Sequence, residues 1–113
     1  MDRSQQYRSV IHQVLNDYYR LYSQSENSCL ETMVLCDEVN DQYLLLRMGW
    51  DGDRRVNRNV IHVRLRDGKI WVEEDWTEQG VATDFLAAGV ERGAIVLAFH
   101  PPHLREYTEF AAV

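Results

Sequence analysis

The dipeptide Asp67-Gly68, set between two runs of alternating apolar and polar residues, constrains the fold more than any other feature of this sequence. An Asp-Gly pair readily adopts the positive φ angles that a two-residue hairpin turn requires. The turn fixes which residues of the two strands face one another. The facing pairs are Leu65 with Ile70, Arg64 with Trp71, Val63 with Val72 and His62 with Glu73.

This register separates the hairpin into two faces, because successive side chains of a strand point to opposite sides. One face is apolar and is expected to lie in the core. The other carries the polar residues and Trp71. We expect Arg64 to lie on the Trp71 ring and His62 to donate to Glu73, so that neighbours satisfy the cations of this strand.

The remaining elements follow from hydrophobic periodicity and from turn residues. Apolar residues at three- and four-residue steps predict an N-terminal helix over Ser4–Ser23, and the polar cluster at 23–28 predicts a loop. Strands are predicted at Leu30–Glu38, Gln42–Trp50, Arg55–Arg66 and Lys69–Trp76. Their short connections predict an antiparallel meander.

After the meander, Thr77 is predicted to cap a second helix that ends near Ala88. The segment Ala94–Phe99 is apolar throughout, which is typical of a strand buried on both faces. The tail from His103 to Val113 is expected to pack as a short turn or helix. The fold class is therefore α+β, with the buried strand in the same sheet as the meander.

The 113 residues fit a single domain, 1–113, and 45% of them are hydrophobic, enough for one core. No segment approaches the roughly 18 apolar residues that a membrane span needs, and no secretory signal is recognisable. We expect a soluble, cytoplasmic protein that does not bind membranes. Cys29 and Cys36 lie too far apart in one extended segment to bridge each other, and we expect both to be small core residues.

The net charge of −6 disfavours binding to a polyanion. Five arginines on and near the third strand, Arg54, Arg55, Arg58, Arg64 and Arg66, raise a nucleic-acid hypothesis. Acidic residues on or just beyond the next strand, Glu73, Glu74, Asp75 and Glu78, argue against it because they would repel phosphates. We therefore expect no direct binding of nucleic acid.

One face of the predicted sheet would expose apolar side chains unless something covers it, and large exposed apolar patches are uncommon on monomers. The tail of the chain or a second subunit could cover it, and a homodimer is the simplest external cover. The candidate interface consists of Tyr43, Leu45, Val60, Arg64 and Trp71.

No catalytic constellation is evident, and no cofactor or metal is predicted. His100 and His103 flank Pro101-Pro102, and the two prolines prevent the helix that would aim both rings at one metal ion. A histidine that closes the last strand is the favoured interpretation of His100. A small enzyme that uses His100 remains a third functional hypothesis.

An ordered set of short motifs resembles the XisI family over nearly the whole chain. The motifs are Tyr7-Arg8 with Ile11, Gly49-Trp50-Asp51, Arg54-Arg55-Val56, Asp67 to Val72, Asp75, Thr77-Glu78, Gly80-Val81-Ala82, Ile95 to Pro102, Arg105 and Thr108 to Ala111. The chain departs from the family pattern before the last strand, where it reads Val90-Glu91-Arg92-Gly93-Ala94.

The resemblance implies an fdxN element excision controlling factor, a non-catalytic accessory protein in programmed DNA excision in cyanobacteria. It also implies partners, a recombinase and a nuclease-like companion called XisH. The first hypothesis is control of excision through a XisH-like partner. The alternative is an antitoxin-like inhibitor of a XisH-like nuclease. The family has no established catalytic residues to carry over.

Overall fold

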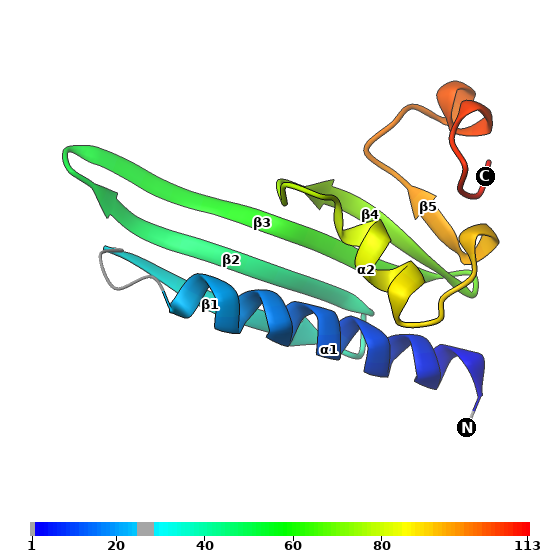
Figure 1. The fold of residues 1–113 in the computed structure, drawn as a ribbon, viewed down its shortest axis with the longest axis horizontal. Helices are drawn as coiled ribbons and strands as arrows, with labels where there is room; N and C mark the ends of the chain where they lie inside the picture. The colour runs from blue at the N-terminus through cyan, green and yellow to red at the C-terminus, as the bar shows by residue number, and fades with distance from the viewer. Residues whose placement is uncertain (1, 25–28) are drawn as a thin grey trace.

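Helix α1 (Arg3–Ser23) runs along one face of a five-stranded sheet in the computed structural model, which describes residues 2–24 and 29–113 (Figure 1). Its first turn is capped by Asp2, whose carboxylate accepts a hydrogen bond from the amide of Gln5 at 2.8 Å. The apolar stripe predicted from the sequence is the side that packs on the sheet. Its buried members are Tyr7, Ile11, Val14 and Leu15.

The predicted antiparallel meander is confirmed. Its strands are β1 (Leu30–Asp37), β2 (Gln42–Asp51), β3 (Arg54–Arg66) and β4 (Lys69–Asp75), and they lie in this order in the sheet. The β2–β3 hairpin extends well past the end of β4 (Figure 1). Residues 25–28 of the predicted loop lie outside the described residues.

The β3–β4 register is confirmed near the turn and shifts further along. Three predicted pairs form, but His62 faces Glu74 because a bulge at Glu73 adds a residue to β4. The predicted hydrogen bond from His62 to Glu73 therefore does not form, and that prediction is wrong. The His62 ring instead lies 2.8 Å from the side-chain oxygen of Gln42 on β2.

A second bulge lies between β2 and β3, where Leu45 faces Ile61 and Leu46 faces Asn59. Val60 is the extra residue. Because a bulge brings two consecutive residues towards one side, Val60 and Ile61 are both buried beneath α1. A prediction that places successive side chains of β3 on opposite faces cannot give two consecutive buried residues.

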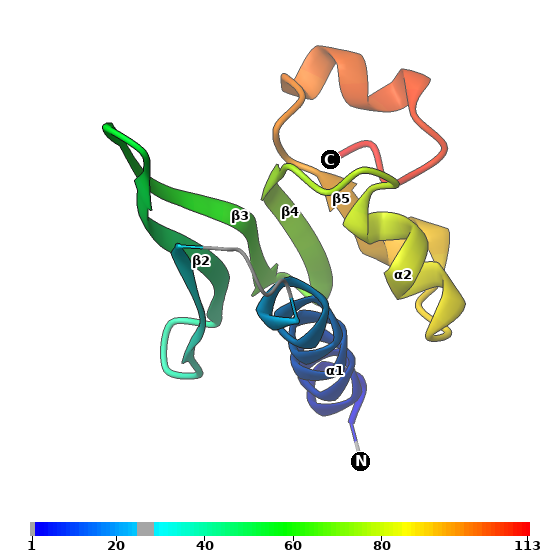
Figure 2. The ribbon, with the colours of Figure 1, turned by 60° about the vertical axis from the view of Figure 1, so that its left-hand side comes forward.

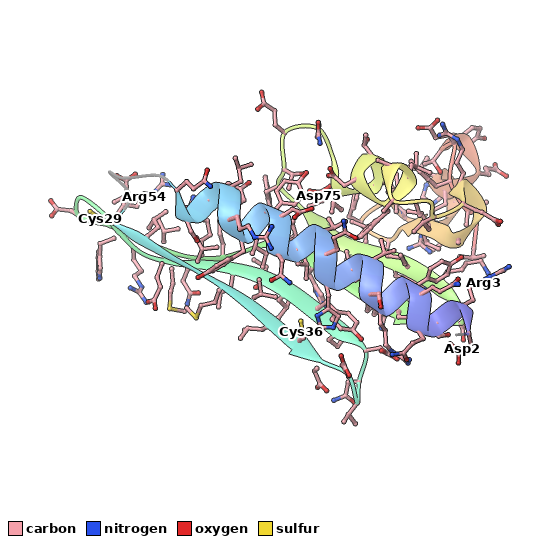
Figure 3. The ribbon with its side chains drawn as sticks, turned by 60° about the horizontal axis from the view of Figure 1, so that its bottom comes forward. Asp2, Arg3, Cys29, Cys36, Arg54 and Asp75 are labelled. Carbon is pink, nitrogen blue, oxygen red and sulfur yellow. The ribbon has the colours of Figure 1, made fainter. Side chains whose placement is uncertain are left out.

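Helix α2 (Val81–Ala87) begins later than predicted: its N-cap residue is Gly80, and the carboxylate that binds its first amide is that of Asp75 instead of a side-chain cap from Thr77. Asp75 lies at the end of β4, and its carboxylate accepts hydrogen bonds from the amides of Val81 at 2.6 Å and Thr77 at 2.9 Å (Figure 3). One carboxylate therefore joins the sheet to the start of α2. The Tyr18 hydroxyl donates to Asp84 and connects α1 to α2.

A 3-10 turn, η1 (Arg92–Ala94), leads into β5 (Ile95–Leu97), which pairs in parallel with β4 and is shorter than predicted. Ile95 and Val96 point to opposite faces and are both fully buried, as the apolar run predicted. A second 3-10 helix, η2 (Pro102–Tyr107), begins the C-terminal segment, which lies beyond β5 and away from α1 (Figure 2). The amide of Ala111 donates to the carbonyl of Ile95.

Within the described residues, none of the helices combines the length and the apolar character that crossing a bilayer requires.

Candidate functional site

Three of the five candidate interface residues lie in the core. Tyr43 and Leu45 are 0% exposed and Val60 is 3% exposed. Tyr43 faces Val63 and Leu45 faces Ile61, so these residues share the face that α1 covers. Their expected place on the outer face is wrong: the register with β3 turns Tyr43 and Leu45 towards α1, and the bulge turns Val60 the same way.

The outer face carries a different set of apolar side chains on β1 and β2. We call this set the outer strip. Leu35 faces Leu44, and Met33 faces Leu46, on the side of the sheet opposite α1. Leu35 is 44% exposed and the others are half-buried. The outer strip consists of Met33, Leu35, Leu44, Leu46 and Met48.

Trp71 and Arg64 lie on the outer face, as predicted. The guanidinium of Arg64 lies 5.7 Å from the Trp71 ring centroid, and its Nε donates to Glu73 at 2.8 Å. Arg66 approaches the same ring at 5.1 Å and pairs with Asp67. Each of these two guanidinium groups therefore has an acidic partner, and the Trp71 ring lies half-buried between them.

Arg105 is buried and holds the C-terminal segment against the outer face. Its guanidinium donates to the carbonyls of Ala98, His100 and Val113 at 3.2, 3.0 and 2.8 Å, and it lies 5.6 Å from the Trp71 ring centroid. Three carbonyls and an aromatic face compensate for burying the charge. Arg105 therefore has a structural role.

The far half of β3 differs, because β4 does not reach it. Among residues 2–24 and 29–113, Arg54, Arg55 and Arg58 have no carboxylate within the 4.0 Å ion-pair distance. Arg55 lies over Trp50 and Arg58 over Trp76, with 5.5 and 5.6 Å to the ring centroids. The premise that hairpin neighbours neutralise every arginine of this strand is wrong for these three.

Two of these arginines line a hollow of about 130 Å³ between the end of α1 and the β2–β3 hairpin. We call it the distal cleft. Arg54 lies at the end of the molecule opposite Asp2 (Figure 3). The polar and aromatic side chains that line the distal cleft are those of Tyr22, Arg47, Asp51, Arg54, Arg58 and Trp76.

At the end of the molecule opposite the distal cleft, Arg8 of α1 donates two hydrogen bonds to the carboxylate of Asp41 in the β1–β2 turn, at 2.8 and 3.1 Å. The Tyr43 hydroxyl also donates to Asp41 at 2.8 Å. The hydrogen bond from Arg8 lowers the pKa of the Asp41 carboxyl, and burial raises the pKa of Tyr43. Sequence reasoning missed this network, whose members lie far apart along the chain.

The structure also brings together His12, Cys36 and Glu38. The Cys36 sulfur lies 3.7 Å from His12 Nδ1, and His12 Nε2 lies 3.1 Å from the Glu38 carboxylate. A catalytic thiol needs a lowered pKa, whereas partial desolvation by its neighbours, and to a lesser degree Glu38, raises the pKa of Cys36. Both cysteines are exposed, so the prediction that they are core residues is wrong.

His100 packs its ring on Phe99, with 4.6 Å between the ring centroids, and its carbonyl accepts from Arg105. His103 is exposed in η2. In the described part of the chain, no three histidine, cysteine or acidic side chains are grouped so that they could hold a metal ion.

Comparison with known proteins gives matches over the full length. The family model described as XisI protein matches residues 1–112. The crystal structure of fdxN element excision controlling factor XisI from Anabaena variabilis ATCC 29413 is 38% identical, with a TM-score of 0.84 over 99% of this chain and 100% of that chain. A XisI-like protein from the same organism is 28% identical, with a TM-score of 0.88 over 97% and 99% of the two chains. No curated protein matches. The chain belongs to the XisI family.

Proposed function

We propose that this protein controls the excision of a DNA element as a non-catalytic accessory factor that acts through protein partners. The observation that carries the proposal is the match to an fdxN element excision controlling factor at 38% identity over the full length. The companion we propose is a XisH-like protein, which the family resemblance implies.

The outer strip is the surface we propose for self-association. It offers a row of half-buried apolar side chains, while α1 covers only the other side of the sheet. Apolar side chains in this arrangement suit burial against a second protein surface.

The charges at the margins of the outer strip favour a second copy of the chain as the occupant. Glu31 lies at the β1 margin and Arg55 at the β3 margin of the same face. In a two-fold dimer the same patch meets itself, so the acidic margin of one copy can face the basic margin of the other. We therefore propose a homodimer that presents its remaining surfaces to the XisH-like companion.

The test places a charge in the outer strip with Leu44→Glu and compares it with Leu21→Glu, which changes a 62% exposed leucine on α1. Light scattering should give twice the 13.3 kDa chain mass for the wild type and for Leu21→Glu, and the mass of one chain for Leu44→Glu. A variant at Leu45 is unsuitable because that side chain is fully buried.

A pull-down with the co-expressed XisH-like protein tests the partner. Retention by the wild type supports the proposal, and its absence under conditions where both proteins are folded contradicts it. If light scattering gives the mass of one chain for the wild type, the proposed homodimer is contradicted. The pull-down with the XisH-like protein remains a valid test of the partner in that case.

A further inference from the structure

We infer that the distal cleft is a binding site for single-stranded nucleic acid. This proposal is independent of the proposed homodimer, since the distal cleft opens on the α1 side of the sheet and the outer strip lies on the other.

The first observation is an excess of unneutralised positive charge. Residues 54–58 contain three arginines and no acidic residue, although the whole chain has a net charge of −6. Arg54 and Arg58 lie on one side of β3 and have no ion-pair partner among the described residues. Guanidinium groups along a groove are the usual means of holding a phosphate backbone.

The second observation is the aromatic lining. Tyr22 and Trp76 border the same hollow as the arginines, and Trp76 is 61% exposed. The indole nitrogen of Trp76 donates to Glu74 at 2.7 Å, which orients the ring before any ligand arrives. An oriented, exposed aromatic ring beside guanidinium groups is the arrangement on which unpaired bases stack.

Two features favour unpaired bases over an acidic peptide or a duplex. Asp51 also lines the hollow; its carboxylate repels phosphates and acidic side chains alike, but a base offers it an amino group to bind, which an acidic side chain does not. A duplex keeps the faces of its bases stacked on one another and leaves none for Trp76. The ligand class is therefore single-stranded DNA or RNA.

The test measures fluorescence anisotropy of a labelled oligodeoxycytidylate, whose bases carry an amino group, titrated with the full-length protein at several salt concentrations. If Arg54 and Arg58 each neutralise one phosphate, the logarithm of the affinity should fall with the logarithm of salt with a slope of about −1.4. Arg54→Ala/Arg58→Ala should reduce this slope to about zero. Trp76→Leu should weaken binding about tenfold, through the loss of one stacked base.

The matched control is Arg20→Ala/Arg92→Ala, which removes the same charge from two exposed arginines that pair with Asp17 and Glu109. This control and Leu44→Glu should both bind as the wild type does. Circular dichroism checks that each variant is folded.

Three results would overturn the inference. The first is no binding at low salt. The second is an equal loss of affinity in Arg54→Ala/Arg58→Ala and in Arg20→Ala/Arg92→Ala, which would indicate only an effect of net charge. The third is effective competition by polyglutamate or by duplex DNA, which would assign the distal cleft to an acidic protein or to paired strands.

Discussion

The two halves of β3 differ in what surrounds them, although both carry arginines. Residues 61–66 lie between β2 and β4, pack beneath α1, and have Arg64 paired with Glu73. Residues 54–59 pair only with β2, and Arg54 and Arg58 there have no carboxylate partner among the described residues. The length of the neighbouring strand therefore decides which cations are satisfied.

The largest expected difference between the halves is in stability. Ile61→Ala removes a fully buried side chain beside the bulge and should cost about 3 kcal/mol of unfolding free energy. Val56→Ala, on the half-buried far part of the strand, should cost about 1 kcal/mol or less. Urea unfolding of both variants measures the contrast, and equal losses would show that the far half is as tightly packed as the near half.

Arg105 tests whether the C-terminal segment stabilises the near half from the outer face. Arg105→Ala leaves three carbonyls without their donor and should cost about 2 kcal/mol. Arg105→Lys should not restore the loss, because an ammonium group cannot reproduce the fork of donors. Thermal unfolding measures both variants, with Arg92→Ala as the exposed control, and stability equal to this control would contradict the assigned role.

The network at Asp41 predicts how the near end of the sheet responds to acid. The folded-state pKa of Asp41 is lowered, so its contribution is fully present above the unfolded-state pKa of about 3.9. It is lost as the pH falls through the lower, folded-state pKa. The stability gap between the wild type and Asp41→Asn should therefore be largest near neutral pH and shrink below about pH 4. A gap that widens on acidification would contradict the assignment.

The smallest expected effect concerns the ion pairs themselves. A double-mutant cycle on Arg64 and Glu73, both about a third exposed, should give a coupling free energy of about 0.5 kcal/mol that weakens with added salt. Arg54→Ala should change stability by less than about 0.5 kcal/mol, because no partner is lost. A larger loss at Arg54 would reveal a stabilising contact and remove the contrast between the halves.

Sequence reasoning found the elements of the fold, since periodicity and turn residues are local signals. The Asp67-Gly68 turn fixed the pairs nearest to it, and the long apolar stripe of α1 identified its buried side. The candidate interface was predicted less well. Arg64 and Trp71 lie where expected, but Tyr43, Leu45 and Val60 are buried.

These errors have one physical origin. Each bulge inserts a residue and changes which side chains share a face, and bulges at Val60 and Glu73 are decided by packing between strands. The His12–Cys36–Glu38 cluster and the distal cleft were missed because their members come from elements far apart in the chain.

Local signals in the chain specify the order and type of the elements, because hydrogen bonding in turns and the alternation of side chains depend on near neighbours. Which face α1 covers, where β4 stops, and which arginines have no carboxylate in reach are settled only when the elements pack together. These features depend on contacts between segments that are distant in the chain. Whether a charged side chain has a partner, and whether an apolar one is buried, depends on which residues the fold brings next to it.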